Sequence, residues 1–281
     1  MTHWTIQMTV VIVVLLIVGG IVRVHLSWLL CGGVALVVNL VILYPFFLPR
    51  AADLPDTVET LRVMTFNVST RSDHYERITD YIVEVDPDVV LMVEVREDLL
   101  AHLDEIVADA YPHRLAVPSP WTMGKVFLSK TPFTRTDVIP LPSKLGGKTY
   151  LDVSIVSDGK ALRLISVHPF PPTAGRRAQS RNTELQMFAT VAATSEEPVV
   201  LLGDFNASPW SAPMKDLQRS TELRPAAYGH GIRPTWQYLW VLWAPLDYAM
   251  VSDQISVDAY WTGPWLGSDH TPVLLDLWLT Q

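Results

Sequence analysis

The sequence predicts an α/β domain built on two layers of β-sheet, preceded by a helical membrane anchor. Three observations support this prediction. The first fifty residues are almost uncharged, residues 61–281 alternate between strand and helix patterns, and polar side chains recur where the apolar strands end. The mean hydropathy of +0.23 is high for a soluble enzyme, and the apolar excess is concentrated at the N-terminus.

The anchor is predicted over residues 1–50 as a transmembrane hairpin. Residues 6–22 are almost continuously apolar, a short polar interruption follows at Arg23, and residues 26–47 form a second uncharged run. Roughly twenty apolar residues span a bilayer, so the second run is long enough and the first is short. A cleaved signal peptide is the alternative, but the first seven residues lack the lysine or arginine that such a segment begins with.

Two crossings would place both termini on the same side of the membrane. The positive-inside rule does not fix that side, because Arg23 in the tight loop is balanced by Arg50 and Arg62 beyond the hairpin. Residues 51–60 contain Pro55 and several acids, which indicates a linker to a catalytic domain over 61–281.

Composition excludes several classes of protein. The chain has 281 residues, of which 49% are hydrophobic and 18% charged, which is too apolar for a disordered protein. Its single cysteine, Cys31, excludes an intrachain disulfide. The net charge is −8, and it becomes −10 beyond residue 50 because the first fifty residues hold Arg23, Arg50 and no acid. Such a charge opposes tight nonspecific binding of nucleic acid.

Each element of the domain follows from its apolar spacing. Strands are predicted at 61–68, 88–95, 125–129, 150–156, 162–168, 199–202, 246–252 and 272–279. Helices are predicted at 74–85, 97–110 and 176–193. This mixture, without repeats or low-complexity tracts, favours a single α/β or α+β domain with two layers of sheet.

Polar residues cluster where these apolar strands end. They are Asn67, Glu94, His168, Asp204, Asn206, Asp247, Asp269 and His270. Taken singly, each of them also has a purely structural interpretation, because Asn and Asp often occupy turns and helix caps and an isolated histidine is usually structural. Their joint occurrence at strand ends predicts one cleft, since ligands collect at the ends of strands in α/β sheets.

These residue types suit one kind of chemistry. Oxygen ligands from Asn67 and Glu94, without a Cys or His cage, suit Mg²⁺, or Mn²⁺ in its place, and disfavour zinc. A carboxylate can orient or deprotonate water, and a protonated histidine can stabilise the opposite oxygen of a phosphate. The chemistry predicted is hydrolysis of a phosphoester.

Six motifs in this order, TFNVS, LMVEV, SVHPFPP, GDFNASPW, LDYAMVS and GSDH, resemble those of the endonuclease/exonuclease/phosphatase superfamily, which has the DNase I-like fold. The resemblance spans about residues 61–281. It implies a four-layer α/β sandwich, in which two packed β-sheets are flanked by helices, and a divalent metal site at one edge. The chain is thereby expected to be a metal-dependent phosphoric ester hydrolase.

The resemblance also implies a role for each residue. Asn67, Glu94 and Asp269 are assigned to the metal site, with Glu94 as the direct ligand. Asp204 and Asn206 match the pair that positions the water and the phosphate. Asp247 matches the acid that orients His270. His168 matches the phosphate-binding or general-acid histidine and His270 the general base or transition-state stabiliser, and which of the two gives or takes the proton stays open.

Differences from the motifs of particular subgroups narrow the choice of subgroup within the superfamily. Ala207 and Ser208 follow the GDFN motif where inositol polyphosphate 5-phosphatases have Tyr and Arg, and His168 stands where apurinic endonucleases commonly have Tyr. The motif continuing to Trp210, the Pro234-Thr235-Trp236 motif and the apolar N-terminus look most like the membrane-anchored bacterial YafD-like group. That group implies an extracytoplasmic catalytic domain.

Three interpretations of the function remain open. Arg176, Arg177 and Arg181 form a basic patch that would bind the phosphates of a polynucleotide, or else a solvated helix face. An aromatic stretch over residues 236–243, with Trp261 and Trp265, favours a phospholipid or sphingomyelinase-type headgroup as the alternative substrate, unless these rings fill the core. A catalytically inactive scaffold is the third interpretation. We expect a phosphodiesterase of the nuclease type, with the membrane bilayer as its partner.

Overall fold

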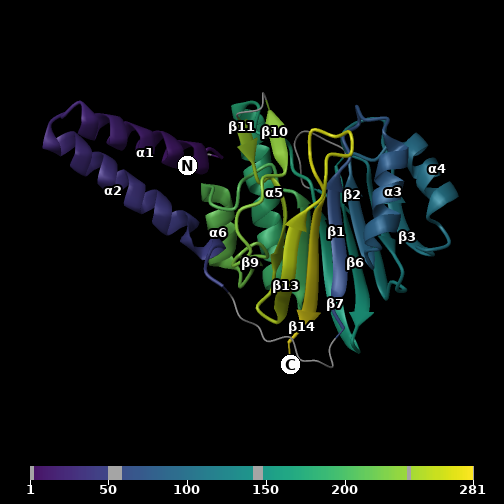
Figure 1. The fold of residues 1–281 in the computed structure, drawn as a ribbon. Coiled ribbons are helices and arrows are strands. Elements are labelled where there is room, and N and C mark those ends of the chain that lie inside the picture. The colour runs from purple at the N-terminus through teal and green to yellow at the C-terminus, as the bar shows by residue number, and fades with distance from the viewer. Residues whose placement is uncertain (1–2, 50–58, 142–147, 239–241, 281) are drawn as a thin grey trace.

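The computed structural model describes residues 3–49, 59–141, 148–238 and 242–280 (Figure 1). Two six-stranded mixed β-sheets lie face to face, with helices on their outer faces. The predicted two layers of sheet and flanking helices are thus present. The predicted linker falls mostly on residues outside the described ranges, as do the loop residues 239–241 of the aromatic stretch.

The first sheet has the strand order β13-β14-β1-β2-β4-β3. Its strands are β13 (Ile255–Thr262), β14 (Val273–Leu279), β1 (Leu61–Asn67), β2 (Val89–Val93), β4 (Lys125–Ser129) and β3 (His113–Val117). Strands β1 and β2 are parallel, and the other neighbouring pairs are antiparallel. The five residues of β2 are all apolar and buried, as expected for a strand covered on both faces.

The second sheet has the strand order β5-β6-β7-β8-β12-β9. Its strands are β5 (Arg135–Pro140), β6 (Thr149–Ser157), β7 (Lys160–Val167), β8 (Val199–Asp204), β12 (Asp247–Val251) and β9 (Arg224–Pro225). Strands β7 and β8 are parallel. A separate two-stranded ribbon is formed by β10 (Trp236–Tyr238) and β11 (Leu242–Ala244).

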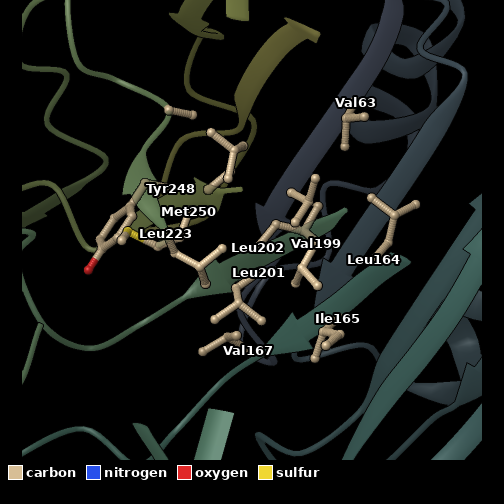
Figure 2. Close-up of a cluster of buried hydrophobic side chains, with 14 of the residues drawn as sticks. Val63, Leu164, Ile165, Val167, Val199, Leu201, Leu202, Leu223, Tyr248 and Met250 are labelled. Atoms are coloured by element: carbon tan, nitrogen blue, oxygen red, sulfur yellow. The ribbon is translucent and has the colours of Figure 1, made fainter. Parts of the chain in front are cut away.

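The main core lies between the two sheets. Apolar side chains of β1, β2 and β4 belong to the same buried cluster as those of β6, β7, β8 and β12. Figure 2 shows part of it, including Val63 of β1, Leu164 of β7 and Val199, Leu201 and Leu202 of β8. Burial on both faces fixes the register of these central strands, and so it fixes where their polar ends emerge.

Four helices cover the outer faces. On the first sheet, α3 (Tyr75–Val85) and α4 (Glu97–Ile106) pack in a second apolar cluster. On the second sheet, α5 (Gly175–Ala193) and α6 (Ala212–Ser220) contribute buried side chains to the main core. Together the layers give the four-layer order that the resemblance implied.

Two apolar helices precede the domain and project from it (Figure 1). They are α1 (Thr5–Ile21) and α2 (Leu26–Leu43), followed by the short 3₁₀ helix η1 (Tyr44–Phe46). Among the described residues, the segment Leu26–Phe46 is long and apolar enough to cross a membrane, and Thr5–Ile21 is shorter. The predicted helices are therefore present, whereas the double crossing and its orientation stay predictions.

Candidate active site

The site forms where the carboxyl ends of the parallel strands of both sheets meet. Asn67 is the last residue of β1 and Asp204 the last residue of β8, while Glu94 and His168 directly follow β2 and β7. In parallel strand pairs these ends lie at the same edge of the sheet. Because the sheets pack face to face, two pairs of strand ends converge.

A carboxylate pair lies at the centre of the site. Asn67 Nδ2 donates to Glu94 Oε1 and to Asp204 Oδ2, at 3.2 Å in each case. The backbone of Glu94 has φ of 65°, a left-handed conformation that is uncommon for this residue type. Such strained conformations gather at functional sites. The backbone N–H of Thr70 donates to Glu94 Oε2 at 3.2 Å, which fixes the orientation of the Glu94 carboxylate.

One glycine allows the β7–β8 pair to approach closely at this edge. Gly203 has φ of +134°, and a Cβ placed on it would lie 2.1 Å from the carbonyl oxygen of Val167. A side chain at this position would push apart the two strands that carry His168 and Asp204. The glycine of the GDFN motif is thus explained by local geometry.

The loop after β8 is held by side-chain hydrogen bonds. Asn206 donates its backbone N–H to Asp204 Oδ1 at 2.8 Å, and its Nδ2 to the carbonyl of Pro169 at 3.0 Å. The guanidinium of Arg181 donates to the carbonyl of Asn206 at 2.9 Å. Burial, followed by the negative charge of Asp247, raises the pKa of Asp204 to about 7. This carboxyl can therefore exchange a proton near neutral pH.

A second pair links β12 to the loop before β14. His270 Nδ1 lies 2.6 Å from Asp247 Oδ2, as the sequence pairing predicted. Burial opposes protonation of the imidazole, but the charge and hydrogen bond of Asp247 outweigh it and raise the pKa of His270 to about 10. His270 is therefore an imidazolium at neutral pH, suited to donating a hydrogen bond to a phosphate oxygen.

His168 has the opposite character. Its Nε2 lies 3.6 Å from Glu94 Oε1 and 3.9 Å from Asp204 Oδ2. Burial and the nearby ammonium groups of Lys148 and Lys125 lower the pKa of His168 well below its usual range. The two histidines thus differ in charge: His168 is neutral, and His270 is cationic.

The oxygen donors suit a hard divalent cation. Glu94 and Asp204 are side by side, and the amide of Asn67 contacts both carboxylates. Asp204, Asp247 and His270 form a second, overlapping group whose potential ligand atoms lie within 4.8 Å of one another. Asp247 Oδ1 is buried and has no hydrogen-bond partner among the described residues. Carboxylate oxygens are donors that Mg²⁺ and Mn²⁺ prefer, whereas Asn67 presents its Nδ2 to both carboxylates and its Oδ1 to the N–H of Ser69.

A cavity of about 680 Å³ opens onto these groups. Glu94, His168, Asp204, Asn206 and His270 all line it. Asp269, predicted for the metal site, also lines it, but its exposed carboxylate accepts a hydrogen bond from Trp236 Nε1 at 3.3 Å. It lies at the rim, and the carboxylate pair lies deeper.

The three arginines of the predicted basic patch differ in exposure. Arg181 is buried, and its guanidinium contacts the carbonyl of Asn206 and the side chain of Asn182. Arg176 and Arg177 are exposed at the start of α5, where Arg177 contacts Thr173 of the cavity lining. The arrangement gives Arg181 a structural contact with the Asn206 loop and leaves two arginines facing solvent.

Sequence reasoning missed several residues that hold the site together. Ser268 Oγ donates to the carbonyl of Asn67 and accepts from the N–H of His270, which ties the histidine loop to β1. Thr235 Oγ1 accepts from the N–H groups of Leu246 and Asp247. Both residues stood inside noted motifs, but serine and threonine are too frequent in loops to be singled out.

The most unexpected group is a pair of buried lysines behind His168. Lys148 Nζ lies 3.1 Å from Glu184 Oε2 and 3.9 Å from the ring centre of Phe170. Lys125 Nζ donates to the carbonyl of Met123. Burial lowers the pKa of Lys148 to about 8 and that of Lys125 to about 7. No sequence pattern indicates that these two lysines are buried, because lysine is normally a surface residue.

The fold and the site geometry define a class of protein. The sequence profile of the Endonuclease/Exonuclease/phosphatase family matches residues 64–270, so the chain belongs to this family. Family members are phosphoric ester hydrolases, and they generally use a divalent metal. A search of curated protein sequences finds no match to the chain.

Solved structures share the fold at low sequence identity. D. rerio TDP2 complexed with a single-strand DNA product has a TM-score of 0.67 at 16% identity, covering 78% of this chain and 98% of that one. The endonuclease/exonuclease/phosphatase from Beutenbergia cavernae has 0.65 at 23% identity, covering 79% and 72%. The human nocturnin catalytic domain has 0.65 at 18% identity, covering 80% and 97%.

Proposed function

We propose that the chain is a membrane-anchored, Mg²⁺-dependent phosphodiesterase, with residues 61–281 as the catalytic domain and residues 1–50 as the anchor. The observation that carries the proposal is the convergence of seven polar residues from six strand ends. Five of them line one cavity, namely Glu94, His168, Asp204, Asn206 and His270, and Asn67 and Asp247 form hydrogen bonds to members of that lining. A catalytically inactive scaffold would not need these residues, since burying polar groups costs free energy unless they are paired.

The cation would be held by Glu94 with Asn67 beside it. When bound, it would polarise a phosphoryl oxygen and offset the charge that develops on the phosphate. Asp204 would orient the attacking water and accept its proton, since its pKa is raised to about 7. The amide of Asn206, 3.2 Å from Asp204 Oδ2, fixes the direction of that carboxylate.

The two histidines would also act on the phosphate. His270 is kept cationic by Asp247 and would donate a hydrogen bond to a phosphoryl oxygen or a proton to the leaving oxygen. Neutral His168, next to both carboxylates, would donate a hydrogen bond to a second phosphate oxygen. In this proposal Asp204 is the base, and His270 is the histidine that would act as the acid.

A polynucleotide is one candidate substrate. The structural neighbour solved with a single-strand DNA product supports it, as do the exposed Arg176 and Arg177. The net charge of −8 and the structural use of Arg181 count against tight binding of a polyanion. We therefore expect cleavage of small or weakly bound phosphodiesters in the first instance.

The cation site is tested by Glu94→Gln, which removes one charge and keeps the side-chain size. We expect the Mg²⁺-dependent hydrolysis of bis(4-nitrophenyl) phosphate by the detergent-solubilised full chain to fall on the order of 100-fold. Half-maximal activity should also need more Mg²⁺. Glu105→Gln, at an exposed position of α4, is the matched control and should stay within about twofold of wild type. An unchanged Mg²⁺ dependence in Glu94→Gln would exclude this site.

A further inference from the structure

The first residues of the N-terminal segment form part of the active-site cavity. His3 and Trp4, just before α1, line the same cavity as Glu94 and His168. His3 Nδ1 accepts a hydrogen bond from the N–H of Ser208 at 3.2 Å, in the loop that carries Asn206. Burial, followed by the charge of Arg181, lowers the pKa of His3 to about 4, so its nitrogen is free to accept.

The domain-side end of the second helix is fixed as well. Phe46 is buried and makes edge-to-face contacts with Tyr228 and Trp210, whose ring centroids lie 4.9 Å and 5.7 Å from its own. The N–H of Gly231 donates to the carbonyl of Phe46 at 2.7 Å, and that of Gly229 to the carbonyl of Pro45 at 3.1 Å. Both helices are therefore anchored to the domain at the end that faces it.

The point where the helices leave the domain is sharply defined. Gln7 Nε2 donates to the carbonyl of Trp243 at 2.6 Å, and the next residue, Met8, is already 54% exposed. Exposed apolar side chains continue along both helices from Met8 to Val41. With a rise of 1.5 Å per residue, Trp4 lies about 6 Å along the helix from Met8. A bilayer around these helices would begin within about one helical turn of the cavity wall.

An aromatic groove extends the active site at this same level. A neighbouring cavity of about 770 Å³ is lined by Trp236, Trp243 and Trp265, and it shares Trp236, Asp269 and His270 with the active-site cavity. Trp265 is 57% exposed. Tryptophan favours the interface between lipid and water. At the far end of the anchor, Trp28 is 73% exposed, so tryptophans flank the apolar stretch on both sides.

We propose that the His3–Trp4 segment completes the active-site cavity, so that the cavity opens at the surface of the membrane holding α1 and α2 and accepts the phosphodiester headgroups of lipids in that surface. This proposal rests on the proposed function. The lipid chains would stay in the bilayer beside α1, the aromatic groove would contact the glycerol region, and the phosphate would reach Asp204 and His270. A substrate delivered in the plane of the membrane needs no basic binding surface, which agrees with the net charge of −8.

The reaction would be a hydrolysis. The oxygen of water bonds to phosphorus, the bond between phosphorus and one ester oxygen breaks, and the proton lost by the water ends on that oxygen. The products are a phosphomonoester and an alcohol, one of which stays in the membrane. Analysis of the lipid and aqueous phases identifies which ester bond is cleaved.

The first test uses the full chain reconstituted with Mg²⁺ in vesicles of phosphatidylcholine and phosphatidylethanolamine. We expect headgroup release by wild type, and a fall of at least about tenfold in Trp4→Ala, because an aromatic wall of the cavity is lost. The loss on lipid should exceed the loss on bis(4-nitrophenyl) phosphate at least about fivefold. Trp28→Ala, exposed at the far end of the anchor, is the matched control and should stay within about twofold of wild type on both substrates.

The second test measures where the cavity lies. In a Cys31→Ala background, a fluorophore is attached at Gln237→Cys, an exposed position that pairs with Trp243 and lines the aromatic groove. We expect quenching by headgroup-labelled lipids, whereas the same probe at Ile106→Cys, exposed on α4, should remain unquenched.

The outcomes separate the two proposals. Cleavage of bis(4-nitrophenyl) phosphate or an oligonucleotide, with no headgroup release, would overturn the lipid proposal and leave the phosphodiesterase standing. Equal losses in Trp4→Ala on lipid and soluble substrate, or an unquenched probe at residue 237, would also overturn it. Failure to hydrolyse any phosphodiester would reject the proposed function, and the lipid proposal with it.

Discussion

At the residue scale, the hydrogen bond between His270 and Asp247 determines which histidine is charged. The two atoms are 2.6 Å apart and both side chains are buried. Thr235 and Ser268 hold the backbone of the two residues in place. An aspartate at this position both stabilises the imidazolium and fixes the orientation of the ring.

Asp247→Asn tests this pairing. The change removes the charge but keeps the shape, so we expect kcat to fall on the order of 100-fold while KM changes little. The far-UV circular dichroism spectrum should match that of wild type. Turnover equal to wild type in a folded protein would show that Asp247 does not position His270.

The positions of the site residues could be predicted because each ends an apolar strand. Asn67, Glu94, His168 and Asp204 are polar residues directly after buried runs, and the structure brings all four together. Their chemical roles are predictions that the proposed variants test. Ser268 and the buried lysines could not be predicted, because their role depends on contacts between segments far apart in sequence.

At the element scale, predicted boundaries were accurate where burial was continuous. Strand β4 has the predicted bounds, and α5 differs by one residue at its start. Strand β5 was missed because its edge position leaves most of its residues exposed. Strand β13 was missed because the β-bulge between Val257 and Ala259 interrupts its alternation.

Strand β4 also carries Lys125, whose burial has a consequence for stability. Lys148, Glu184 and His168 are the titratable groups whose charges couple with it. Its pKa is lowered from 10.5 to about 7, so between pH 7 and 10.5 the unfolded chain binds a proton that the folded chain does not. The penalty is full below pH 7 and disappears as the pH rises toward 10.5.

Lys125→Met should therefore stabilise the protein most at low pH. We expect a gain of roughly 2 to 4 kcal/mol at pH 6, where the ammonium must be buried in the wild type. At about 2–4 °C per kcal/mol, Tm in detergent micelles should rise by several degrees, and the gain should vanish near pH 10. The same gain at both pH values would point to apolar packing rather than to charge.

At the scale of the whole molecule, the two sheets and the N-terminal segment all contribute to the active-site cavity. The face-to-face sheets bring four strand ends together, and the first residues before α1 close the cavity from the side. The sequence predicted the helices and the domain as separate parts. Their contact could not be predicted, because His3, Gln7 and Phe46 carry no pattern that points to a partner in the domain.

The central claim is that this cavity hydrolyses phosphodiesters with the help of a divalent cation. The measurement that tests it most directly compares the full chain with its His270→Ala variant on DNA, RNA and phospholipid vesicles, with Mg²⁺ and with a chelator. His113→Ala, on β3 and remote from the cavity lining, is the control variant. We predict Mg²⁺-dependent hydrolysis by wild type and by the control, and a loss of about 10²- to 10⁴-fold in His270→Ala. Hydrolysis that survives the chelator, or that is equal in His270→Ala and wild type, would contradict the account.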